Sequence, residues 1–98
     1  MALSNSQVRF LRGLAHDLKP VVMVGAKGVT PALVAELEIA LDHHELVKLR
    51  IDAEDRDARD AAAADLAKRV GAERVQRIGH TLTLYRKNRE NPRITLPR

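Results

Sequence analysis

The residues of this chain best suited to chemistry lie in a short glycine loop, Gly25-Ala26-Lys27-Gly28. Glycine at both ends of the loop permits positive φ angles and a close approach of the backbone to a ligand, because no Cβ stands in the way. Lys27 adds a mobile positive charge between the two glycines. These groups suit the binding of phosphate, although the same residues also fit an ordinary tight turn between two elements.

The elements on either side decide how the loop is presented. Residues 21–24 are four consecutive apolar residues, which predict a strand buried on both faces, as in a central or parallel strand. Thr30 and Pro31 predict the start of a helix, with Thr30 as the N-cap and proline at the first helical position. We therefore expect the free N–H groups of that helix start to point towards a ligand in the loop.

Hydrophobic periodicity predicts three helices and four strands in the whole chain. The helices are expected at residues 5–16, at 31–43 and from Asp55 or Asp57 to 70. The strands are expected at residues 21–24, 46–51, 73–78 and 81–86, with Gly79-His80 as a two-residue hairpin between the last two. In the strand at 46–51, Lys48 and Arg50 alternate with apolar residues and belong to its polar face.

This order, α-β-α-β-α-β-β, predicts one α/β (α+β) domain of two layers over residues 1–98. Its four strands are expected to form a mixed sheet flanked by helices, with the final hairpin antiparallel. The core must be built from aliphatic residues, since Phe10 and Tyr85 are the only aromatic ones. Residues 87–98 are polar and basic and contain two prolines, so we expect a flexible tail, a short edge strand or a docked tail.

Composition excludes several classes of protein. The chain has no cysteine, which excludes disulfides and thiolate metal sites and fits a reducing compartment. No apolar run approaches the ~20 residues that a membrane span needs. The first residues lack the basic-then-apolar pattern of a signal peptide. A cytoplasmic protein without a membrane partner is therefore expected.

The net charge of +4 conceals three blocks of opposite sign. Residues 1–28 carry +3, residues 29–65 carry −6 and residues 66–98 carry +7. Such segregation favours a polyanionic partner at the basic parts of the chain, although a merely solubilising surface would have a similar composition. Nucleic acid is the partner that this pattern favours.

Catalytic and metal-binding patterns are weak. Ser4 and Thr30 are explained as helix caps, and no hydroxyl sits in a nucleophile motif. The acids of residues 52–57 imitate a calcium loop only loosely, because no glycine stands at its sixth position. His43 and His44 are adjacent and so point to different faces of a helix, which prevents joint binding of one metal ion. We predict no enzyme, no cofactor and no metal.

The same composition restricts how nucleic acid could be bound. Too few aromatic residues are present for a base-stacking platform, and no recognition-helix or zinc-finger pattern occurs. Contacts are therefore expected mainly with phosphate and ribose, through lysine, arginine and backbone N–H groups. A structured RNA suits such contacts better than a specific DNA site.

Five segments resemble a known family. The chain is similar, over its whole length and in the same order, to the CRM domain in its small stand-alone bacterial form, the YhbY family. The segments are Gly-Leu-Ala-His at 13–16, Leu-Lys-Pro-Val-Val at 18–22, Val-Gly-Ala-Lys-Gly-Val-Thr at 24–30, His-His-Glu-Leu-Val-Lys at 43–48 and Thr-Leu-Thr-Leu-Tyr-Arg at 81–86. Arginine replaces the family's lysine at several basic sites, and residues 58–64 are rich in alanine, which leaves the choice of RNA open.

The resemblance implies an RNA-binding domain whose sheet is like that of the C-terminal domain of translation initiation factor three. The family's GxxG loop corresponds to Gly25–Gly28 and is taken to touch RNA, as does the similar loop of KH domains. Only the loop chemistry carries over from KH, because the loop follows a strand in this chain. Bacterial members of the family are associated with precursors of the large ribosomal subunit.

These observations together predict a cytoplasmic, non-catalytic protein, monomeric in solution, that binds ribosomal RNA or its precursor during large-subunit assembly. The expected RNA-binding residues are Gly25, Ala26, Lys27 and Gly28, with Lys19, Arg12, His16, Arg86 and Lys87 extending the surface. The alternative is an adaptor that grips a basic ribosomal protein through its acidic helices.

Overall fold

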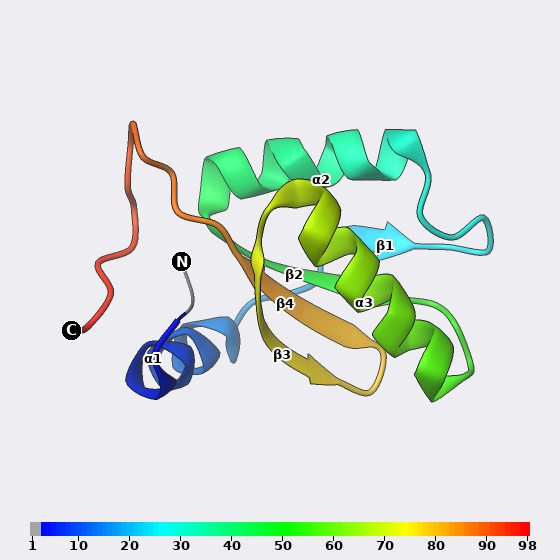
Figure 1. Cartoon of the computed structure of the whole chain (residues 1–98), viewed down its shortest axis with the longest axis horizontal. Helices are drawn as coiled ribbons and strands as arrows, with labels where there is room; N and C mark the ends of the chain where they lie inside the picture. The colour runs from blue at the N-terminus through cyan, green and yellow to red at the C-terminus, as the bar shows by residue number, and fades with distance from the viewer. Residues whose placement is uncertain (1–2) are drawn as a thin grey trace.

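The arrangement of the chain is seen in a computed structural model that describes residues 3–98 (Figure 1). The helices are α1 (Asn5–Ala15), α2 (Pro31–His44) and α3 (Arg56–Val70). The strands are β1 (Val22–Val24), β2 (Leu46–Ile51), β3 (Glu73–Ile78) and β4 (Thr81–Tyr85). They form one sheet in the order β1-β2-β4-β3, in which β1 is parallel to β2 and the other neighbours are antiparallel. The predicted element order and the mixed sheet are confirmed.

Each helix begins at the residue that its sequence signals. Ser4 and Gln7 form the expected capping box of α1, with the Gln7 N–H donating to Ser4 Oγ at 3.2 Å. Thr30 caps α2 by accepting from the Leu33 N–H at 3.1 Å. Asp55 is the N-cap of α3, which ends at Gly71 in the left-handed conformation that glycine favours. Local chemistry therefore determines where the helices start and stop.

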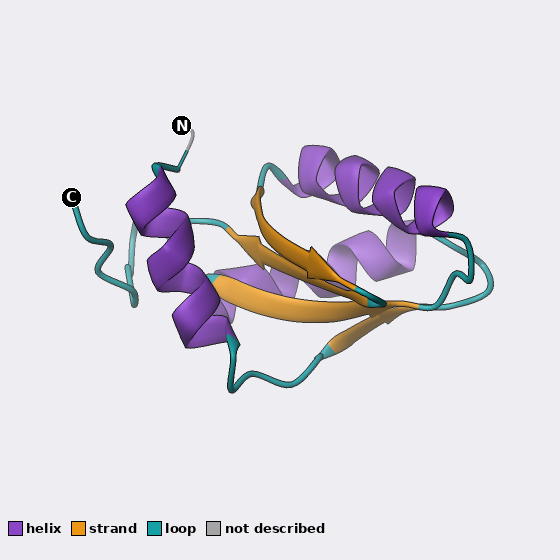
Figure 2. Ribbon diagram, turned by 90° about the horizontal axis from the view of Figure 1, so that it is seen from below, coloured by secondary structure: helices purple, strands orange, loops and turns teal. Residues whose placement is uncertain are grey.

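Two apolar clusters hold the layers together. Helices α2 and α3 pack on one face of the sheet, where Leu37, Leu41 and Leu66 meet the alternating side chains of β2 and β4. Helix α1 packs near the end of the sheet at which β2 begins, where Leu11 and Ala15 contact Leu46, Val75 and Tyr85 (Figure 2). Because successive strand residues point to opposite faces, α1 covers the face that α2 and α3 leave free.

The placement of β1 corrects one prediction. The strand is parallel, as expected, but it lies at the edge of the sheet and is only three residues long. Val22 and Val24 face the core, whereas Met23 is 60% exposed. Val21, also expected in the strand, precedes it and is 57% exposed. The apolar run is therefore buried on one face only, because no helix covers this part of the opposite face.

Residues 87–98 have no regular secondary structure but are docked on the domain. Ile94 and Leu96 pack against the α1 cluster. The carboxylate of Glu45 binds the backbone of this tail. It accepts hydrogen bonds from the N–H of Asn88 at 2.7 Å, of Arg93 at 2.6 Å and of Ile94 at 2.8 Å. Of the three possibilities left by the sequence, the docked tail is the one observed.

Glu45 is an unusual residue at the junction of α2 and β2. The residue is fully buried. Its backbone φ of +60° is one that residues other than glycine rarely adopt. Its own carbonyl accepts from the Arg86 N–H at 2.9 Å, so it also fixes the chain that leaves β4. Burial raises the pKa of Tyr85, and the negative charge of Glu45 raises it further. One residue thus ties α2, β4 and the tail together.

We expect Glu45→Gln to release the tail. The amide would place N–H donors against backbone N–H donors and would remove the charge from three hydrogen bonds, so the free energy of unfolding should fall by at least about 2 kcal/mol. Hydrogen exchange should accelerate at the amides of Asn88, Arg93 and Ile94. Glu36→Gln is the matched control, since Glu36 is exposed on α2. Unchanged protection at the three amides would contradict this role for Glu45.

Candidate nucleic-acid interface

The glycine loop forms an open turn at the end of β1. The Gly28 N–H donates to the Gly25 carbonyl at 3.0 Å, and Gly28 has a φ of +71°. A Cβ placed on either glycine would meet nothing within 4 Å. Within residues 3–98, the N–H groups of Ala26, Lys27 and Val29 find no hydrogen-bond acceptor. These donors are therefore available to an anion that approaches the turn.

The turn lies at the end of the sheet where β1 and β2 finish and where both core helices begin. Helix α2 starts at Pro31, directly after the loop, and α3 starts after the end of β2 (Figure 1). The Asp52 N–H donates to the Val24 carbonyl at 2.9 Å and joins the base of the loop to the β2–α3 turn. Helix N-termini carry partial positive charge, so the backbone N–H groups at this end of the sheet favour the binding of an anion.

Acidic side chains limit the directions from which an anion can reach the loop. The β2–α3 turn contains Asp52, Glu54 and Asp55. Arg59 orders this turn by donating from Nη1 to the carbonyls of Ala53 at 2.8 Å and Glu54 at 2.7 Å. Like charges repel, so a phosphate approaching over the β2–α3 turn is disfavoured. An anion is therefore expected to reach the loop from the side away from the β2–α3 turn.

Three further predicted residues lie near the other end of β1. Lys19 is exposed in the segment between α1 and β1. Arg12 and His16 are exposed at the end of α1, and Arg12 Nε donates to the Val75 carbonyl at 3.4 Å. Because α1 packs where β2 begins and the loop lies where β2 ends, these residues lie at the opposite end of β1 from Gly25–Gly28.

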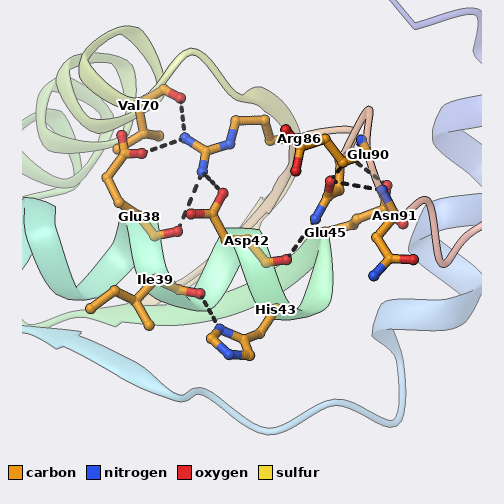
Figure 3. Close-up of polar contacts among 10 residues, drawn as sticks. Glu38, Ile39, Asp42, His43, Glu45, Val70, Arg86, Glu90 and Asn91 are labelled. Carbon is orange, nitrogen blue, oxygen red and sulfur yellow. Dashed lines mark hydrogen bonds and ion pairs between the residues drawn. The ribbon is translucent and has the colours of Figure 1, made fainter.

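Arg86 has a structural environment that its sequence position does not reveal (Figure 3). Its Nη1 donates to Glu38 Oε2 at 2.7 Å and to the Val70 carbonyl at 2.8 Å. Its Nη2 donates to Asp42 Oδ1 at 2.8 Å. The guanidinium is thus committed to α2 and to the end of α3, and we leave it out of the interface. Lys87 is exposed, but it follows β4 at the end of the sheet opposite to the loop.

Lys48 and Arg50 are basic residues absent from the predicted set. Both lie on the face of β2 opposite to Val47, Leu49 and Ile51, which belong to the core of α2 and α3. In the sheet register Arg50 lies between Met23 of β1 and Thr81 of β4, on the part of that face beyond α1. Their alternation in the sequence already showed the polar face, but only the strand order shows which elements lie beside it.

Metal-binding and membrane-spanning features were also sought in the described part of the chain. Residues 3–98 contain no group of three or more histidine, aspartate or glutamate side chains placed to hold a metal ion. No helix in the same range has the length and apolar character to cross a membrane.

Comparison with known proteins gives consistent matches. The sequence model of the CRS1 / YhbY (CRM) domain family matches residues 3–86. A Haemophilus influenzae protein named RNA-binding protein is 46% identical over 96 residues, which are 98% of this chain and 96% of the relative. A Bacillus subtilis protein named as a probable RNA-binding protein is 36% identical over 95 residues, 97% of this chain and 99% of the relative.

A solved structure has the same fold. The solution structure of a Staphylococcus aureus protein, described as a candidate RNA-binding protein, superposes with a TM-score of 0.85 at 31% identity. The match covers 98% of this chain and 100% of that one. The arrangement of helices and strands described above is therefore shared over 98% of this chain.

The two glycines should respond differently to alanine. Gly28→Ala places a side chain at a φ of +71°, so it should lower the free energy of unfolding by about 1–2 kcal/mol. Gly25→Ala meets no neighbouring atom and has no positive φ, so it should leave stability almost unchanged. Urea denaturation of the two variants checks this difference. A stability equal to that of the wild type in both variants would show that the turn tolerates a side chain at both positions.

Proposed function

Because the chain belongs to the CRS1 / YhbY (CRM) domain family, we propose that it is an RNA-binding protein that acts without catalysis. The observation that carries this proposal is the open glycine turn, with unpaired N–H groups and Lys27 ahead of the start of α2. The names of the Haemophilus influenzae and Bacillus subtilis relatives support RNA as the partner.

In this mechanism the turn holds phosphate groups of the RNA backbone. The N–H groups of Ala26, Lys27 and Val29 donate to phosphate oxygens, and the Lys27 ammonium adds a charge-assisted contact. Lys48, Arg50 and Lys19 attract the same RNA strand over the sheet face opposite to α2 and α3, where α1 does not cover it. Phosphate contacts position a protein without reading sequence, so the RNA is selected mainly by its folded shape.

We further propose that the RNA is ribosomal and that the protein takes part in assembly of the large subunit in the cytoplasm, binding as a monomer. The resemblance to the bacterial YhbY family supports this narrower function. Lys27 lies on the loop, and Lys48 and Arg50 lie on the sheet face opposite to α2 and α3, whose acids are on the other layer. A folded RNA that meets this side of the domain therefore avoids the carboxylates of α2 and α3.

The adaptor alternative depends on the acidic helices and has weaker support. Glu38 and Asp42 pair with Arg86, Asp60 pairs with Arg77 and Asp65 pairs with Arg69. These internal pairs reduce the charge that α2 and α3 can offer to a basic protein. Nuclease treatment of complexes isolated from cells separates the two functions, because an adaptor keeps its partner after the RNA is digested and an RNA-binding protein releases it.

Lys27→Ala should weaken binding to a structured RNA and reduce the dependence of affinity on salt. Loss of one phosphate contact lowers the slope of log affinity against log salt by roughly 0.7–0.9. Filter binding at several salt concentrations measures the slope. Lys68→Ala, which removes an exposed lysine from α3, is the control and should leave the slope unchanged. An unaltered slope in a folded Lys27→Ala variant would remove Lys27 from the interface.

Crosslinking in cells tests the identity of the RNA. If the protein assists large-subunit assembly, sequencing of the crosslinked RNA should show enrichment of large-subunit ribosomal RNA or its precursor over messenger RNA. The Lys27→Ala variant, expressed at the same level, should recover less of this RNA. Reads spread evenly over messenger RNA would contradict the ribosomal function while leaving general RNA binding in place.

A further inference from the structure

A hollow of about 430 Å³ lies near the start of β1, bordered by α1, the segment that follows it, β2 and the tail. Its lining includes Leu14, Leu18 and Val21, which are 42%, 38% and 57% exposed. The remaining lining residues in the described chain are apolar or basic, and none is acidic. An apolar surface with basic neighbours is thus open to solvent beside Lys19 and Lys48.

We propose that this hollow receives an unpaired nucleobase of the bound RNA, while Lys19 and Lys48 contact the phosphates on either side of that nucleotide. The inference rests on the proposed RNA-binding function and adds a site for a base to a mechanism that otherwise uses only phosphate. Its occupant is a nucleotide in a loop or bulge, because a base within a duplex is stacked and cannot enter.

The chemistry of the lining favours a nucleotide over an apolar protein side chain. A nucleotide joins an apolar ring to an anionic phosphate, and the hollow places aliphatic side chains next to two lysines. An apolar side chain of a protein would satisfy the first feature and leave the lysines without an anionic partner. The volume lies within the range of small-ligand pockets, which combine a mostly apolar lining with a few polar groups.

The hollow and the glycine turn are close enough for one RNA strand to reach both. Val21 in the hollow and Gly25 in the turn are four positions apart in the chain, and a fully extended chain spans at most ~3.6 Å per residue. Their Cα atoms are therefore no more than about 14 Å apart, a distance that a few nucleotides of one strand can span. Val21 is held in register with β2 by its N–H, which donates to the Lys48 carbonyl at 3.0 Å.

The test compares two synthetic RNA hairpins that differ only in the bases of their unpaired loop. One hairpin is intact, and in the other the loop nucleotides are abasic, so that ribose and phosphate remain. The wild-type protein should bind the intact hairpin more tightly. Leu18→Gln should weaken binding of the intact hairpin about fivefold, the change that corresponds to losing about 40 Å² of apolar contact, and should leave the abasic hairpin unaffected.

Two controls make the result specific. Ile39→Gln changes an apolar residue that is 60% exposed on α2, away from the hollow, and should alter neither affinity. Lys27→Ala should weaken both hairpins, because it acts on phosphate. Leu14→Gln provides a second variant of the hollow if Leu18→Gln proves unstable in urea, since the Leu14 side chain is 42% exposed.

The outcomes separate this inference from the proposed function. Equal affinity of the wild type for the two hairpins, or equal losses for both with Leu18→Gln, would overturn the base site and leave phosphate binding intact. That pattern is also the one expected if the hollow receives an apolar side chain of a protein. Failure of the wild type to bind either hairpin would contradict RNA binding itself, and the base site with it.

Discussion

The parallel pairing of β1 with β2 is the constraint that places the candidate interface. Neighbouring parallel strands cannot be joined by a hairpin, so the chain must cross over through α2. The loop before α2 and the turn before α3 are consequently brought to the same end of the sheet. At this end the Ile51 N–H also donates to the His80 carbonyl at 2.7 Å. The glycine turn therefore lies beside two other connections, one of them acidic.

The same pairing places the acids of α2 and α3 on one face of the sheet and two basic residues of β2 on the other. Helices α2 and α3 carry six of the thirteen acids and pack together on one face, while Lys48 and Arg50 project from the other face of β2. Basic side chains also lie on the helical layer: α3 itself carries four, and the Arg86 guanidinium reaches back to Glu38 and Asp42 of α2. Arg86 thereby joins α2 to the end of α3, and its charge is paired with carboxylates of the same domain.

Features that depend on nearby residues could be predicted from the sequence. The caps at Ser4 and Thr30, the stop at Gly71 and the alternation of β2 all involve groups a few residues apart. Features that depend on distant partners could not. The acids that pair with Arg86 are 44 and 48 residues away, and the position of β1 at the edge follows from strand pairing, which an apolar run does not reveal. The glycine loop is local and was identified, whereas its separation from Arg12, His16 and Lys87 is a property of the whole sheet.

The fold constrains Gly25 and Gly28 differently. Gly28 has the positive φ that the turn requires, so an alanine there is disfavoured by folding whether or not the protein binds anything. Gly25 has neither a positive φ nor a neighbour that a methyl group would meet, so folding alone permits replacement. Retention of glycine at position 25 among related proteins would therefore report on the ligand, and retention at position 28 on the fold.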